Sequence, residues 1–207
     1  EGIAAGPVTE WLAERADVAP PLHFELITGG HSNLTYLVAD RNGGRWVLRR
    51  PPLGQVLATA HDMTREARII GALGPTDVPV PPVVGVCTDE AVNGAPFYVM
   101  DYVDGTVVRD LATAERFSVE ARRTAGKALV EVLARIHAVD VDSVGLGDLS
   151  RREGYIERQL KRWHGQFHKS AGRDLPVVDE VHERLAANIP EQGPATIVHG
   201  DYRLDNC

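Results

Sequence analysis

The last nine residues constrain the fold of this chain more than any other segment. They run from His199 to Cys207, read H-G-D-Y-R-L-D-N-C, and follow the strand-like apolar run 195–198. Asp201 and Asn206 stand five positions apart in this segment. Asp and Asn in a glycine-containing turn are also ordinary loop residues that bond their own backbone. The pattern therefore needs support from the rest of the chain before it predicts a site.

The chemistry of phosphoryl transfer explains an aspartate and an asparagine at this spacing. The acceptor hydroxyl must be oriented and relieved of its proton, while a divalent metal neutralises charge on the transferred group. Asp201 suits the first task as general base, and Asn206 suits the second as metal ligand. The spacing matches the H-R-D-x-x-x-x-N loop of protein kinases, with Gly200 in place of the arginine.

H-G-D-x-x-x-x-N resembles the catalytic loop of the aminoglycoside phosphotransferase family, kinase-fold enzymes that phosphorylate small molecules. The resemblance implies an α+β, two-lobe protein-kinase-like fold. Residues 1–103 would form a mainly antiparallel β N-terminal lobe that ends in the hinge, and residues 104–207 part of a helical C-terminal lobe. A family member would continue past Cys207 with a strand that carries a second metal-binding Asp. We therefore expect the chain to be a piece of a longer protein.

A glycine-containing loop between two predicted strands, 24–27 and 34–38, is a candidate for covering nucleotide phosphates. Glycines permit close backbone approach, and exposed amide N–H groups bond phosphate oxygens. The alternative is a hairpin turn in which Ser and Asn bond locally. The candidate residues are Gly29, Gly30, His31, Ser32 and Asn33.

The next predicted strand, 45–49, carries a candidate phosphate-binding cation. Alternation places Val47 and Arg49 on one face, as V-A-I-K does for the adenine wall and the lysine of a kinase. The segment V-L-R-R-P-P resembles a subgroup of the family, the kinase-like domains attached to acyl-CoA dehydrogenases. The planar fork of an arginine can hold two phosphate oxygens. The alternative is a solvated arginine pair, Arg49 and Arg50, at the end of a strand.

A predicted helix, 60–73, offers this cation a carboxylate partner. Glu66 shares its apolar face with Ile69, Ile70 and Leu73, at i, i+3, i+4 and i+7. An inward carboxylate needs a partner to offset its desolvation. Arg49 is the natural candidate and would resemble the Lys–Glu pair of kinases. A local bond to Arg65 or a position at the edge of the helix is the alternative.

The segment 96–105 is predicted to form an apolar strand that is followed by a turn. By resemblance this strand becomes the kinase hinge, where backbone groups of Asp101, Tyr102 and Val103 meet the adenine edge and Met100 lies behind it. As a pattern alone, the run predicts a buried strand.

Composition excludes several classes of protein. The chain has 22 Lys and Arg against 29 Asp and Glu, a net charge of −7, which argues against general nucleic-acid binding. No stretch approaches the roughly 20 apolar residues that span a membrane. We expect a cytoplasmic protein without a membrane partner. Cys87 and Cys207 form no cysteine framework, so each is expected to be a small buried apolar residue.

A basic stretch bears on the acceptor. Residues 151–169 contain six Arg or Lys and two Glu, and the segment 153–163 again resembles the acyl-CoA dehydrogenase-associated subgroup. A solvated helix face is one explanation. An anionic acceptor such as a coenzyme A thioester is the other, since its phosphates favour Arg and Lys.

Together these features predict a phosphotransferase that uses ATP or GTP with Mg²⁺ and acts on a hydroxyl of a small molecule, with a hydroxyacyl-CoA as one anionic candidate. The alternative is a non-catalytic, nucleotide- or ligand-binding pseudokinase module. Arg49 in place of the usual lysine favours that alternative. A protein kinase fits less well, because Gly200 replaces the expected arginine and no activation segment is present.

Overall fold

The computed structural model describes residues 2–27, 33–54 and 62–207. Four predicted phosphate-loop residues lie outside these ranges, and their role stays a prediction: Gly29, Gly30, His31 and Ser32. The chain divides into two compact units, one formed by Glu1–Val139 with Val198–Cys207 and the other by Asp140–Ile197. The predicted boundary between an N-terminal and a C-terminal lobe near residue 103 does not coincide with the boundary between these two units, and it stays a prediction.

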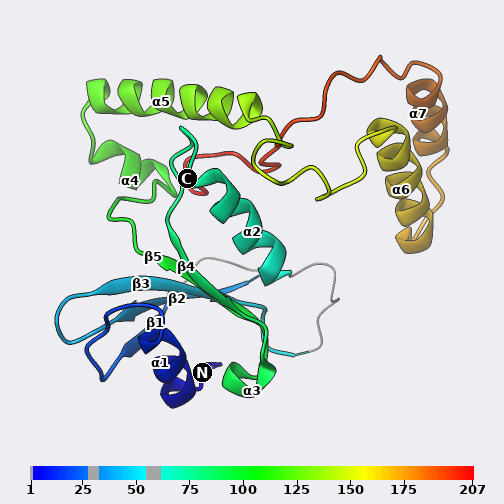
Figure 1. Ribbon diagram of the computed structural model, residues 1–207. Helices are drawn as coiled ribbons and strands as arrows, with labels where there is room; N and C mark the ends of the chain where they lie inside the picture. Colours follow the sequence, from blue (N-terminus) through cyan, green and yellow to red (C-terminus); the bar gives the residue numbers. More distant parts are fainter. Residues whose placement is uncertain (1, 28–32, 55–61) are drawn as a thin grey trace. The chain divides into compact units, whose positions relative to one another are not determined.

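The first unit is built on a five-stranded antiparallel sheet with the order β1-β2-β3-β5-β4 (Figure 1). The strands are β1 His23–Leu26, β2 Leu34–Ala39, β3 Arg45–Arg50, β4 Val83–Cys87 and β5 Phe97–Asp101. β1, β2, β3 and β5 lie where the sequence predicts them, to within a few residues. β4 was not predicted.

One face of this sheet packs against helix α1, Ala5–Ala13. Alternation in β3 turns Trp46 and Leu48 to this side, where they join a buried apolar core. Each large side chain that is fully buried here contributes about 1.5–3 kcal/mol. The core contains Val8, Trp11, Leu12, Tyr36, Val38, Trp46, Leu48, Cys87, Phe97 and Val99. Cys87 is buried as expected, whereas Cys207 is exposed, contrary to expectation.

Helix α2, Met63–Leu73, covers the opposite face of the sheet. Asp62 caps it, because its carboxylate accepts a hydrogen bond of 2.9 Å from the Arg65 amide. Met63 and Ala67 pack against Tyr98 of β5 in a second buried cluster. The two helices therefore lie on opposite sides of the strands (Figure 1). α2 brings Glu66 to the face that carries Arg49.

The other helices of this unit are α3 Glu90–Asn93, α4 Leu111–Glu115 and α5 Val119–Ala138. Ser118 caps α5, because its hydroxyl accepts a bond of 3.1 Å from the Ala121 amide. The apolar stripe of α5, which contains Leu129, Val130, Leu133 and Ile136, is at least partly exposed except at Ile136, which is buried. His137 is exposed. The described residues place little packing against this stripe.

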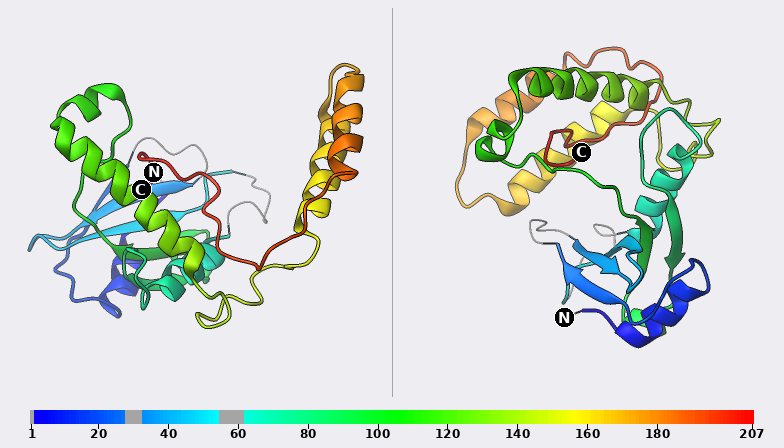
Figure 2. Two further views of the ribbon diagram at one scale, coloured as in Figure 1. Left: turned by 90° about the horizontal axis from the view of Figure 1, so that it is seen from above. Right: turned by 90° about the vertical axis from the view of Figure 1, so that its left-hand side faces the viewer.

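The second unit contains α6, Tyr155–Ser170, and α7, Pro176–Ala186. These helices lie side by side in both views of Figure 2. The segment before α6 is fixed by Arg152, which pairs with Asp142 and donates to the Gly147 carbonyl at 3.0 Å. Arg158 donates to the Arg151 carbonyl at 2.6 Å. Two cations of the basic stretch are thus used within this unit.

The apolar run before the catalytic loop is not a strand. Residues 191–199 have no regular secondary structure, and Val198 is 71% exposed. A strand needs a neighbour for its backbone N–H and C=O groups, and no described strand pairs with this run.

The helices in the described part of the chain are all too short or too polar to cross a membrane.

Candidate active site

Arg49 of β3 and Glu66 of α2 form an ion pair. Arg49 Nη2 lies 3.6 Å from Glu66 Oε2, and the side chains are 31% and 32% exposed. Arg49 is therefore not a solvated residue at a strand end. The carboxylate faces the sheet and not its neighbour Arg65. The structure thus contains the predicted pair, while its role toward a nucleotide stays a prediction.

Two more groups hold the Glu66 carboxylate. Asn33 Nδ2 donates to Oε1 at 2.8 Å, and the Tyr98 hydroxyl donates to Oε2 at 3.2 Å. Asn33 is buried and directly precedes β2. The partners therefore come from the residue before β2, from β3 and from β5, and together they fix the position of Glu66. A hydrogen bond to a charged group contributes about 1.5–3 kcal/mol.

Tyr98 was missed as a site residue. It stands directly opposite Arg49 in the register of β3 and β5. Burial raises the pKa of Tyr98 above its ordinary value, and the nearby Arg49 charge acts in the opposite direction. The alternation that placed Met100 in the site places Tyr98 on the same face, two residues earlier. The two-residue periodicity of the strand was therefore the sequence signal that could have identified Tyr98 as a site residue.

The Arg49 guanidinium has unused donors. Its Nε is buried and has no hydrogen-bond partner among the residues that the structure describes. Phosphate oxygens are acceptors that suit such a fork, so the residues present fit a bound phosphate. Arg50 differs, because it points to the α1 side and donates to the carbonyls of Pro51 and Asn93 at 3.2 Å. Arg50 is therefore a structural residue.

The predicted adenine wall and hinge lie together along β3 and β5. Val47 is buried and stands opposite Met100 in the strand register. The Asp101 amide donates to the Pro82 carbonyl at 2.9 Å, and the Tyr102 amide donates to the Arg45 carbonyl at 3.4 Å. Those two N–H groups are therefore occupied.

Val103 differs from its neighbours in the hinge. It is 63% exposed, and its N–H has no partner within the described ranges. Arg45 flanks this segment, with its guanidinium 4.4 Å from the Tyr102 ring centre and 2.5 Å from Asp104. An adenine donor contact in the hinge would fall to Val103. Arg45 was not predicted as part of this segment.

The catalytic loop is organised around Asp201 and Asn206. Gly200 has a φ of +85°, a conformation that favours glycine, which explains its place in the motif. Asn206 Nδ2 donates to the Asp201 carboxylate at 2.7 Å and to its carbonyl at 3.0 Å. Asn206 Oδ1 has no partner among the described residues and is an oxygen of the kind that Mg²⁺ prefers. The Asp201 side chain is 67% exposed and accessible to an acceptor.

Three further residues support this loop. Arg203 Nε lies 3.5 Å from Asp201 Oδ1 and 3.0 Å from Asp205 Oδ1. The Tyr202 hydroxyl donates to the Leu129 carbonyl of α5 at 2.8 Å. The loop is thus tied to α5, and the Asp201 carboxylate contacts both an amide and a cation. The sequence motif gave no roles to these supporting residues.

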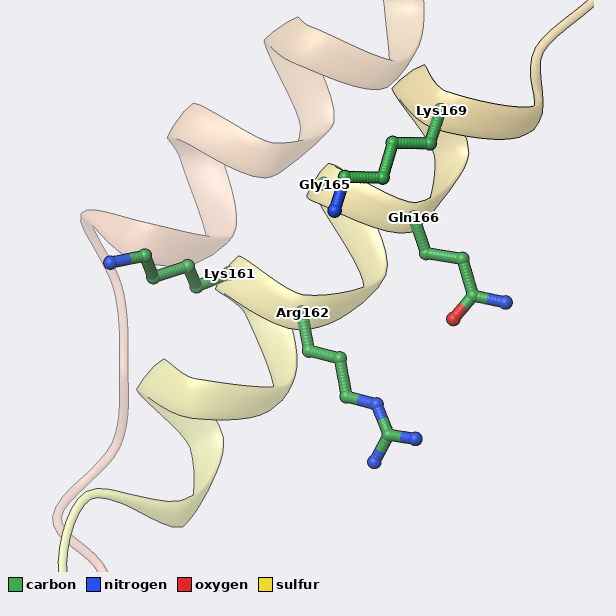
Figure 3. A pocket seen from close by; sticks show the side chains of 5 residues that line it. All are labelled: Lys161, Arg162, Gly165, Gln166 and Lys169. Carbon is green, nitrogen blue, oxygen red and sulfur yellow. The ribbon is translucent and has the colours of Figure 1, made fainter. Parts of the chain in front are cut away.

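The second unit has a pocket on its surface, lined by one helix. Its residues are Lys161, Arg162, Gly165, Gln166 and Lys169 of α6 (Figure 3). All three cations are exposed, and none forms an ion pair with another described residue. This α6 face is therefore open and positively charged.

Residues 23–207 match the sequence profile of the phosphotransferase enzyme family. Mouse acyl-CoA dehydrogenase family member 10 is 36% identical over 188 residues, which cover 90% of this chain and 17% of the mouse protein. Human acyl-CoA dehydrogenase family member 11 is 35% identical over 178 residues, or 86% of this chain and 23% of that protein. The chain thus spans less than a quarter of the length of these relatives.

Solved structures confirm the predicted fold. A Ralstonia eutropha JMP134 protein assigned as an aminoglycoside phosphotransferase has a TM-score of 0.80 and 33% identity, over 97% of this chain and 58% of that one. Macrolide 2′-phosphotransferase of Brachybacterium faecium has a TM-score of 0.58 and 22% identity, over 89% and 60%, and supports the fold alone. The chain therefore belongs to the phosphotransferase enzyme family, and it is similar to the acyl-CoA dehydrogenase-associated members that its sequence motifs predict.

Proposed function

We propose that this chain forms the nucleotide-binding part and catalytic loop of an ATP-dependent phosphotransferase that acts on a hydroxyl of a small molecule. The observation that carries the proposal is the contact between Asn206 and Asp201. The amide nitrogen of Asn206 fixes the aspartate, and its amide oxygen remains for a metal. This arrangement supports the proposal, because it orients the candidate general base and leaves a candidate metal ligand exposed to solvent.

Each residue of the candidate site has a proposed role that follows from its chemistry. MgATP, when bound, supplies the phosphoryl group and the cation that neutralises its charge. Asp201 orients the acceptor hydroxyl and takes its proton, and Asn206 Oδ1 ligates the metal. Arg49 donates to phosphate oxygens, because Glu66 holds the guanidinium in place. Val47 and Met100 border the base, next to the hinge.

We further propose an anionic acceptor, with a hydroxyacyl-CoA as the leading candidate. The matched relatives are named as acyl-CoA dehydrogenase family members. The exposed cations of α6 are the second support, since coenzyme A carries phosphates that Lys and Arg bind. Aminoglycosides are polycations and would be repelled by such a surface.

Arg49 favours a second candidate, a non-catalytic nucleotide-binding module. Arg49 stands where the family usually carries lysine, which favours this alternative, and its pair with Glu66 would keep nucleotide affinity even where turnover is lost. The two candidates differ in turnover and agree in nucleotide binding. Measuring both quantities in one preparation separates them.

The test is Mg²⁺-dependent ADP release by the full-length protein across a panel of acceptors. The panel holds hydroxyacyl-CoAs, aminoglycosides, choline-like alcohols and a generic protein substrate, with Asp201→Asn as control. We expect hydroxyacyl-CoAs to stimulate release and the variant to abolish it. Stimulation of ADP release by aminoglycosides alone would contradict the proposal of an anionic acceptor. Nucleotide binding without stimulation by any acceptor would favour the non-catalytic module.

A further inference from the structure

Three potential metal ligands meet where α6 packs on α7. His164 and His168 are one turn apart on α6 and share a face, and Asp179 lies in the first turn of α7. One ligand atom from each lies within 4.8 Å of the others. We propose that His164, His168 and Asp179 bind a divalent first-row transition-metal ion, at a site formed by residues other than those of the candidate active site.

The distances fit one face of an octahedral metal. Asp179 Oδ1 lies 2.7 Å from His164 Nε2 and 2.8 Å from His168 Nε2, and the two nitrogens are 3.1 Å apart. With metal–ligand bonds of about 2.0–2.1 Å, neighbouring ligands are about 2.9 Å apart in an octahedron and about 3.4 Å in a tetrahedron. The three distances between ligand atoms lie around the value expected for an octahedron. Two His and one carboxylate on one face leave further positions open.

Hydrogen bonds alone satisfy this arrangement poorly. A bond between the two Nε2 atoms requires one of them to be an acceptor, and its lone pair then points into the cluster. If both nitrogens carry protons, both can donate to Asp179 Oδ1, but the two N–H groups then face each other across 3.1 Å without an acceptor between them. A divalent cation removes both problems, because all three atoms can bind it through lone pairs.

Aromatic neighbours hold the histidine rings. His182 stacks on His164, with ring centres 4.0 Å apart and an interplanar angle of 13°. Phe167 contacts His168 edge-on at 5.5 Å. The ligands are 28–45% exposed at their side chains and accessible from solution.

The ligand chemistry separates this site from the one at Asn206. Imidazole suits zinc, nickel, cobalt and iron, whereas Mg²⁺ prefers oxygen ligands. Excess Mg²⁺ should therefore not compete for the histidine site. Because the ligands come from two helices, the ion would link α6 to α7 and stabilise that hairpin.

The experiment is a calorimetric titration of the chelator-treated protein with Zn²⁺, in a buffer that contains excess Mg²⁺. We expect one Zn²⁺ per chain at this site. His168→Gln and Asp179→Asn should each weaken binding by at least about tenfold. Two controls should bind as the wild type does: His23→Gln, at an exposed strand histidine, and Cys207→Ser, at an exposed thiol.

The Co²⁺ spectrum of the wild-type protein gives a second readout that needs no variant to fold. Bands of a nitrogen- and oxygen-ligated ion are expected, and thiolate charge-transfer bands would assign the metal to cysteine and overturn the proposal. Absence of Zn²⁺ binding would overturn it as well. So would full affinity in variants whose circular dichroism shows intact helices.

Discussion

Arg49 Nη2 of β3 lies 3.6 Å from Glu66 Oε2 of α2, and Tyr98 donates to that same carboxylate oxygen. This contact joins the central strand of the sheet to the helix that covers it. The cation is thus held by the fold itself, and it would already be in position for a phosphate as proposed. Preorganisation of this kind lowers the cost of binding, because little side-chain freedom remains to be lost.

Arg49→Ala should raise the apparent KM for ATP by about ten- to a hundredfold, the value of one or two charged hydrogen bonds. Arg41→Ala is the matched control, since Arg41 is exposed in the β2–β3 turn. Steady-state kinetics at varied ATP measure the effect. An unchanged KM for ATP would remove the phosphate role from Arg49.

Glu66→Gln should lower the free energy of unfolding by about 1–2 kcal/mol, because Arg49 loses its counter-charge and the amide nitrogen cannot accept the bond that one carboxylate oxygen accepts from Asn33 or Tyr98. Glu25→Gln, on the exposed edge strand β1, should change it by less than about 0.5 kcal/mol. Denaturant unfolding of both variants gives the comparison. Equal stability would mean that the Arg49–Glu66 pair contributes nothing to the fold.

Tyr98→Phe should reduce the loss of stability at alkaline pH. Burial raises the pKa of Tyr98 in the folded protein, so its stabilising contribution is complete below the unfolded value of about 10. Above that pH the unfolded chain ionises first, and stability falls by up to about 1.4 kcal/mol per pH unit.

Unfolding curves at pH 8 to 11 test the Tyr98 prediction. Tyr155→Phe is the control, because Tyr155 is 55% exposed and should leave the alkaline slope unchanged. At neutral pH, Tyr98→Phe should cost about 1 kcal/mol through the lost bond to Glu66. Identical alkaline slopes for wild type and Tyr98→Phe would contradict the shifted pKa.

Asn206→Ala should raise the Mg²⁺ concentration needed for half-maximal turnover by about tenfold or more, because one metal ligand is lost. Nucleotide binding without Mg²⁺ should not change. Asn188→Ala, near the end of α7, serves as the control. A normal Mg²⁺ requirement in Asn206→Ala would show that the metal is held elsewhere.

Sequence periodicity predicted the parts of the fold that depend on local pattern. The alternation in β3 and the helical spacing of Glu66 were enough to place Arg49 and Glu66 on facing surfaces. These signals are local, and the local geometry of strands and helices determines their outcome.

Tertiary context determined what the sequence did not predict. β4 follows a proline-rich segment and forms because β5 offers it hydrogen-bonding groups. The run 195–198 has a strand-like composition but no described partner, and it remains irregular. The meeting of His164 with Asp179 depends on how α7 packs against α6, which the spacing of residues along one helix does not reveal.

The most direct test of the proposed chemistry is to measure nucleotide binding and turnover in Asp201→Asn, with Asp17→Asn at an exposed site as control. We predict that Asp201→Asn binds MgATP with an affinity within about threefold of the wild type, while acceptor-dependent turnover falls by about 10²–10⁴-fold. Turnover close to the wild-type rate in Asp201→Asn would contradict the assignment of Asp201 as the general base.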